Sequence, residues 1–195
     1  INNVKYYTRI STHPSIYANS ISIRLLNTEF FNLKLWPKIH NNIEKIIHKK
    51  GLIVIGGRTC SGKTSLFYSI LSYINTHIIT IEDPVEYNVP NIIQTDISQL
   101  GYDVCIRSAL RQNPDLIGIG EIRDIISAQS AIRATLTGHT VLTTIHINNP
   151  LDVLTRFQEL GCIFIENVLT YIIFMDQFVP QVYIYENNII QEISL

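Results

Sequence analysis

The chain has 195 residues and a formal net charge of -1, with 46% hydrophobic and only 16% charged residues. Its length fits one main domain, and its composition is globular rather than disordered. The near-zero charge excludes a strong global attraction to nucleic acid or to an anionic membrane. Cys60, Cys105 and Cys162 stand far apart, which argues against a disulfide framework or a zinc site and favours a reducing, cytoplasmic compartment.

Neither a signal peptide nor a membrane span is predicted. The chain begins at Ile1 rather than at a methionine, which is compatible with a piece of a longer protein. Its richest apolar stretch, from Cys162 to Met175, is shorter than a span and is interrupted by Glu166 and Asn167. Any membrane contact is therefore expected to be peripheral.

The first segment predicts a β-hairpin. β-branched and aromatic residues dominate 4–10 and 20–27, and Pro14 and Asn19 between them favour a turn. From Leu33 to Lys50, isoleucines recur at helical spacing. We expect one helix there, ending before the glycine that follows.

Strands then alternate with helices, which is typical of an α/β fold with a mostly parallel sheet covered on both faces. The strands read as short apolar runs without polar alternation, as buried parallel strands do. The predicted strands are 52–55, 78–81, 116–119 and 140–145, and the predicted helices are 63–74, 105–113 and 125–135.

A phosphate-binding loop is predicted between the first of these strands and its helix. The run Gly57-Arg58-Thr59-Cys60-Ser61-Gly62-Lys63-Thr64 fills every fixed position of the GxxxxGK[ST] pattern. Glycines let backbone N–H groups turn toward phosphate oxygens, the lysine reaches the β- and γ-phosphates, and the threonine hydroxyl serves Mg²⁺. A chance glycine turn is the alternative, but the strand and helix lie on the required sides. Cys60 is assigned no role.

Two further acidic sites follow buried strands. Glu82, Asp83 and Glu86 come just after 78–81, where they either hold Mg²⁺ and its waters or form an ordinary solvated loop. Glu121 follows 116–119, with Gly120 where P-loop enzymes usually have an aspartate. We predict that Glu121 is the base that polarises water.

Two histidines flank the strand 140–145. His146, at its carboxyl end, is predicted to sense the γ-phosphate, and His139, at the other end, to be structural.

The arginines offer positive charge to phosphate or to a neighbouring subunit's nucleotide. Arg107 and Arg111 share one helix face and Arg123 follows Glu121, although ordinary surface salt bridges are an equal alternative. Arg9 and Arg24, in the predicted hairpin, would reach a nucleotide only if that hairpin folds over it.

Four motifs in order resemble the type II secretion, type IV pilus and competence traffic ATPases. GGRTCSGKTSLFYSIL is similar to that family's Walker A segment and TIEDPVEY to its aspartate box. LRQNPDLIGIGEIRD resembles its Walker B segment and RATLTGHTVLTTIH its histidine box. Four ordered motifs are far more specific than a P-loop alone.

The resemblance implies a RecA-like P-loop ATPase core at 36–195, preceded at 1–35 by the end of a smaller PAS-like α+β domain and a linker. It implies ATP and Mg²⁺ as ligands, a homo-hexamer and an integral membrane platform partner at the inner face of the cell membrane. It assigns Glu121, Lys63 and His146 to catalysis, and Thr64, Glu82 and Glu86 to Mg²⁺, partly through water. The implied nucleotide contacts are Gly57 to Ser65 together with Glu82, Glu86, Arg9, Arg24, Arg107 and Arg111.

Within the family, HINNPLDVLTRFQELG and the lack of a four-cysteine motif resemble the competence ATPases of Gram-positive bacteria. The expected function is then a motor for competence pseudopilus assembly and DNA uptake. A secretion or pilus-retraction ATPase, or a subunit that binds nucleotide without turnover, stays open. Cys60 and Arg58 replace the family's usual glycine and proline, Asn113 replaces an aspartate, and Phe178 stands where arginine is usual, which removes one ion pair.

Overall fold

The computed structural model describes residues 7–14, 16, 20–26, 32–98 and 100–194. By internal contacts the chain divides into two units, Ile1–Phe30 and Phe31–Leu195. The boundary predicted after residue 35, and the assignment of 1–35 to a separate domain remnant, stay predictions.

The first unit contains an antiparallel hairpin of β1 (Tyr7–His13) and β2 (Ser20–Leu26), in which Ile10 pairs with Ile23. The first strand thus runs three residues beyond the predicted end. Residues 4–6 and 27 of the predicted strands lie outside the described residues. The backbones of Arg9 and Arg24 pair across the hairpin, but their side chains also lie outside what the structure describes.

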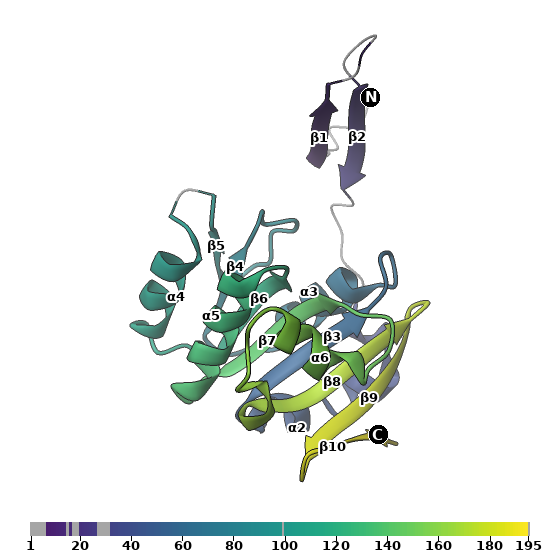
Figure 1. Cartoon of the computed structure of the whole chain (residues 1–195), viewed down its shortest axis with the longest axis vertical. Helices are drawn as coiled ribbons and strands as arrows, with labels where there is room; N and C mark the ends of the chain where they lie inside the picture. The colour runs from purple at the N-terminus through teal and green to yellow at the C-terminus, as the bar shows by residue number, and fades with distance from the viewer. Residues whose placement is uncertain (1–6, 15, 17–19, 27–31, 99, 195) are drawn as a thin grey trace. The chain divides into compact units, whose positions relative to one another are not determined.

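The second unit is built on an eight-stranded sheet in the order β10-β9-β8-β3-β7-β6-β4-β5 (Figure 1). Its six strands from β8 to β5 are parallel, which confirms the predicted α/β class and mostly parallel sheet. The strands are β3 (Leu52–Gly57), β4 (Ile78–Glu82), β5 (Ile93–Asp96), β6 (Leu116–Ile122), β7 (Thr140–His146), β8 (Leu169–Asp176), β9 (Val179–Glu186) and β10 (Ile189–Ile193).

Three of these strands form an antiparallel end of the sheet that the sequence analysis did not predict. β8 pairs parallel with β3 but antiparallel with β9, which in turn pairs antiparallel with β10. The apolar run ending at Met175 is β8, buried along seven of its eight residues because helices and neighbouring strands cover it. Such a run does not by itself distinguish a buried strand from a buried helix.

Helices cover both faces of the sheet. α4 (Tyr102–Leu110), α5 (Ile125–Leu136) and α6 (Asp152–Glu159) lie on the face toward the viewer in Figure 1, and α2 (Ile43–His48) and α3 (Lys63–Tyr73) lie behind it. Right-handed crossovers explain this division, because α3 leads from β3 toward β4 while α5 leads back from β6 to β7. Short 3-10 turns occupy Leu33–Leu35 and Ile165–Asn167.

The single helix predicted from Leu33 to Lys50 is wrong. After the 3-10 turn, α1 (Pro37–His40) ends at Asn41 and α2 begins only at Ile43. The side-chain amide of Asn42 donates to the Lys38 carbonyl at 2.9 Å. Asparagine side chains compete in this way for backbone groups, which favours an interruption of the helix at Asn42.

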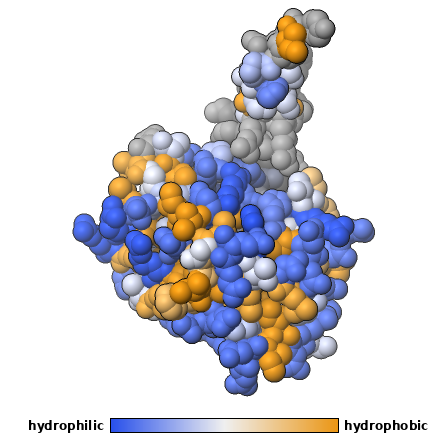
Figure 2. All heavy atoms as spheres, in the orientation of Figure 1, coloured by the Kyte–Doolittle hydropathy of each residue, from blue (hydrophilic) through white to orange (hydrophobic). Residues whose placement is uncertain are grey.

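The core lies between the central strands and the helices on each side. All six residues of β3 are buried, as expected for a strand covered on both faces. Figure 2 shows hydrophobic residues reaching the surface near β9 and β10, an end of the sheet that the helices of that face leave uncovered; Ile189 there is 62% exposed. Within the described residues, no helix is long and apolar enough to cross a membrane.

Candidate functional site

The predicted phosphate loop lies between the carboxyl end of β3 and the first turn of α3. At its start Gly57 has a φ of +149°, and a Cβ there would lie 2.5 Å from the Met175 carbonyl oxygen, so only glycine fits. Among the described residues, the backbone N–H groups of Cys60, Gly62, Lys63 and Thr64 donate to no protein acceptor. The buried hydroxyl of Ser61 also has no partner there. These unused donors at a helix N-terminus fit a bound anion.

Lys63 extends its ammonium group into this loop. Its Nζ donates to the carbonyl oxygens of Gly57 and Arg58, at 2.9 and 2.8 Å. Burial lowers the pKa of Lys63, and the nearby carboxylate of Glu121 opposes this effect. The lysine is thus held at the mouth of the loop, with the exposed hydroxyl of Thr64 directly after it.

His146 connects Lys63 to Glu121. Its Nδ1 lies 3.2 Å from Lys63 Nζ, and its Nε2 lies 2.8 Å from Glu121 Oε1. Burial lowers the pKa of His146, and the ammonium group of Lys63 lowers it further. A neutral imidazole suits this geometry, accepting from the lysine at Nδ1 and donating to the carboxylate at Nε2.

Strand register explains why these three residues meet. β3 pairs with β7 so that Gly57 lies opposite His146. β7 pairs with β6, whose register shifts between Ile119 and Ile122, so that the intervening Glu121 is part of an irregular strand rather than of the loop after it. Glu121 also forms an ion pair with Arg123.

Glu82, by contrast, points into the interior. Its side chain is 2% exposed, and its carboxylate accepts hydrogen bonds from the hydroxyls of Tyr68 and Thr80 and from the Gln94 side chain. Burial raises its pKa, which these donors oppose. Gly120 lies beside it, where a Cβ would make an ordinary contact at 3.4 Å from Glu82 Cγ. The group engaged in this way does not fit an open Mg²⁺ ligand.

Glu86 is held near the same network, because its backbone N–H donates to the Tyr68 hydroxyl at 3.0 Å. In the described residues, no group of three or more His, Cys, Asp or Glu side chains is arranged to hold a metal. The roles of the Thr64 hydroxyl and of the half-buried Glu86 toward Mg²⁺ stay predictions.

The structure does not bring the helical arginines to the loop. Arg107 and Arg111 are exposed at α4, which packs on α5 and β4, and in the described part of the chain neither forms an ion pair. Arg123 does reach the site, pairing with Glu121 and lying 3.9 Å from Asp83. His139 lies at the other end of β7, near the Thr137 hydroxyl.

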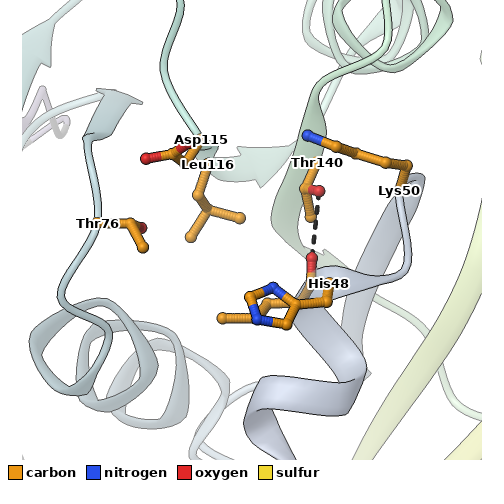
Figure 3. A pocket seen from close by; sticks show the side chains of 7 residues that line it. His48, Lys50, Thr76, Asp115, Leu116 and Thr140 are labelled. Atoms are coloured by element: carbon orange, nitrogen blue, oxygen red, sulfur yellow. Dashed lines mark hydrogen bonds between the residues drawn. The ribbon is translucent and has the colours of Figure 1, made fainter.

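A separate cavity of about 220 Å³ lies at the amino ends of the parallel strands, opposite the phosphate loop (Figure 3). Leu116 and Thr140, the first residues of β6 and β7, line it with His48, Lys50 and Asp115. One wall is fixed by a hydrogen bond from the Thr140 hydroxyl to the Ile47 carbonyl at 3.2 Å. None of the predicted site residues contributes to this cavity.

Sequence reasoning missed Tyr68 and Gln94, which organise Glu82, and the contact of the β8–β9 turn with the phosphate loop. Tyr68 lies five residues after Lys63, where nothing in the local pattern marks it. The turn residue Phe178 donates its backbone N–H to the Ser61 carbonyl at 3.0 Å. The contacts of Tyr68 with Glu82 and of Phe178 with Ser61 each join different segments of the chain, so no single sequence motif predicts them.

Comparisons with known proteins agree with the geometry. A type II secretion system protein E from Aeromonas hydrophila is 38% identical over 165 residues, covering 78% of this chain and 33% of that protein. The X-ray structure of the Legionella pneumophila ATPase DotB matches with a TM-score of 0.73 and 26% identity, covering 94% of this chain and 55% of that one. The crystal structure of the pilus retraction motor PilT with bound ADP matches with a TM-score of 0.69 and 28% identity, covering 90% and 55%.

The chain spans about a third of the length of the curated relatives it matches. The family model for type II/IV secretion system proteins matches residues 1–181. These relatives confirm the predicted secretion and pilus ATPase family, while the competence subgroup stays a prediction. The chain belongs to the type II/IV secretion system protein family.

Proposed function

We propose that this chain is the nucleotide-binding and ATP-hydrolysing core of a secretion or pilus motor. The observation that carries the proposal is the linked trio of Lys63, His146 and Glu121 at the phosphate loop. Two of the three residues lie on β6 and β7, and the register of these strands with each other and with β3 positions them beside Lys63 at the start of α3. The trio therefore belongs to the fold rather than to a flexible surface. The relatives named as ATPases support the same reading.

The residues of the chain divide the chemistry between them. The loop N–H groups and Lys63 bind the phosphates, and Thr64 offers its hydroxyl to Mg²⁺, which when bound supplies charge neutralisation. Glu121 accepts the proton of the attacking water. His146, in its neutral form, orients Glu121 and senses the phosphate beside Lys63, and Arg123 holds the second carboxylate oxygen.

Around this core we propose the wider function expected from the resemblance. The chain acts within a homo-hexamer on the inner face of the cell membrane and drives an integral membrane platform protein. Within the family, we favour assembly of a competence pseudopilus for DNA uptake, with secretion or pilus retraction as the alternative. Arg9, Arg24, Arg107 and Arg111 would serve nucleotides between domains or subunits.

Phosphate release with Mg-ATP tests the enzymatic proposal. Glu121→Gln and Lys63→Ala are each expected to lower turnover by about 10²-fold or more, the first because the general base is lost and the second because the charge that binds the phosphates is lost. Glu44→Gln and Lys50→Ala remove the same groups from exposed positions away from the loop and should leave turnover unchanged. A parent chain that binds ATP without releasing phosphate would instead establish a binding subunit without turnover.

A further inference from the structure

The turn between β8 and β9 has an unexpected residue in it. Asp176 pairs with Val179, so Gln177 and Phe178 form a two-residue turn, with φ of +45° and +69°. Such turns favour Asn and Gly, because a bulky side chain is strained at positive φ. The next hairpin of this chain uses the expected residues, with Asn187 and Asn188 at +52° and +63°.

Phe178 is therefore poorly suited to the turn itself, and its contacts point to another role. Its ring lies against Gly62 of the phosphate loop, where a Cβ would be 2.8 Å from the ring carbon Cδ1. Its N–H donates to the Ser61 carbonyl at 3.0 Å, and its carbonyl accepts from the indole N–H of Trp36 at 2.8 Å. The backbone of the turn is thus fixed at the loop from two sides.

Despite these contacts, Phe178 is 48% exposed. Its place in the sheet is informative. Glu121 and His146 lie on β6 and β7, on one side of β3, whereas the β8–β9 turn lies on the other side. A nucleotide whose terminal phosphate meets Glu121, and which extends along the strand ends in the other direction, would bring its nucleoside to the β8 side of the loop.

We propose that Phe178 is a stacking platform for the base of a bound purine nucleotide. The inference rests on the proposed function, because it needs a nucleotide at the phosphate loop. A rigid exposed aromatic ring loses little conformational entropy on binding, and the larger purines stack best on it. Since the ring offers no hydrogen bonds to the base edge, adenine and guanine nucleotides should bind about equally, and ahead of pyrimidine nucleotides.

The test compares Mg-ADP with inorganic pyrophosphate, which has no base, by calorimetric titration of the whole chain. Phe178→Asn should weaken ADP binding by about tenfold, in the range for a lost base–aromatic stack, and leave pyrophosphate affinity unchanged. Phe178→Trp should retain ADP affinity. Val179→Ala, at the exposed neighbouring position, is the matched control and should change neither.

Thermal unfolding of the same variants separates binding from packing. Asparagine accepts positive φ, so Phe178→Asn should keep the melting temperature of the nucleotide-free chain. A lower melting temperature with unchanged ADP affinity would make Phe178 a packing residue and overturn the inference. Equal losses for ADP and pyrophosphate would do the same, by showing a distorted loop.

The outcomes also separate the two proposals. If the parent chain binds pyrophosphate as tightly as ADP, the stacking role of Phe178 is contradicted, while the proposed phosphate site remains supported. If the parent chain binds neither ADP nor pyrophosphate, the proposed function is contradicted, and so is the stacking role of Phe178.

Discussion

Individual side chains at the phosphate loop depend on each other's protonation. His146 accepts from Lys63 only as a neutral ring, and burial together with the lysine charge holds its pKa below the usual 6.5. In the window between the lowered folded pKa and 6.5, the unfolded chain binds more protons than the folded one. The contribution of this group to stability is therefore present above about pH 6.5 and is lost as pH falls through the folded pKa.

A urea titration of the parent chain from pH 7.5 to pH 5 measures this dependence. We expect the free energy of unfolding to fall more steeply below about pH 6.5 in the parent than in His146→Asn. His48→Asn, at a side chain that is 74% exposed, is the control and should keep the parent slope. Identical slopes for the parent and His146→Asn would contradict the assignment.

The Tyr68 hydroxyl is a second group whose removal should change the free energy of unfolding. It donates to the buried carboxylate of Glu82 and accepts the N–H of the half-buried Glu86, so Tyr68→Phe leaves both groups with a lost partner. A loss of about 1–3 kcal/mol in unfolding free energy is expected from denaturant melts. Tyr73→Phe, on the same helix but 42% exposed, should change it by less than about 0.5 kcal/mol. Equal effects of the two would show that the network adds no stability.

At the scale of elements, β6 contains two glycines that differ in the space around them. A Cβ on Gly118 would lie 2.9 Å from Thr80 Cγ2 and 3.1 Å from the Phe67 ring, whereas one on Gly120 would make ordinary contact with Glu82. The first glycine thus serves the packing of β6 between β4 and α3. The second lies beside Glu82 at a position where a methyl group would fit.

Alanine at each glycine tests this difference. Gly118→Ala is expected to lower the free energy of unfolding by about 1–3 kcal/mol, the usual cost of overpacking. Gly120→Ala should cost clearly less, because its methyl group finds a normal distance. Chemical denaturation of the two variants measures this difference. A larger loss of unfolding free energy in Gly120→Ala than in Gly118→Ala would contradict the assignment.

At the scale of the whole molecule, a bound nucleotide should stabilise the second unit as a body, because the loop joins β3, α3 and the β8–β9 turn. Mg-ADP at a hundred times its dissociation constant is expected to add about 2.7 kcal/mol, seen as a higher melting temperature. Lys63→Ala should abolish this rise. Lys50→Ala, at the amino ends of the parallel strands, should retain the higher melting temperature. A rise that persists in Lys63→Ala would show that the nucleotide binds elsewhere.

The sequence by itself determined the features that consecutive residues specify. The run Gly57–Thr64 predicts a phosphate loop, and apolar runs alternating with helical patterns predict the mostly parallel sheet, because local propensity and burial act within each segment. It also marked Glu121 and His146, since each follows or ends a buried run. The helix from Leu33 to Lys50 was wrong because the helical pattern is interrupted at Asn41 and Asn42, where the Asn42 side chain bonds to the backbone.

Only the tertiary structure decided which of these groups meet. Strand order and register place His146 beside Gly57, turn Glu82 inward onto Tyr68, and bring Phe178 to Gly62 across more than a hundred residues of chain. Pairing of this kind depends on how whole strands pack against one another, and no local pattern encodes it. The chemistry of the loop was therefore readable in one segment, while its neighbours came from the fold.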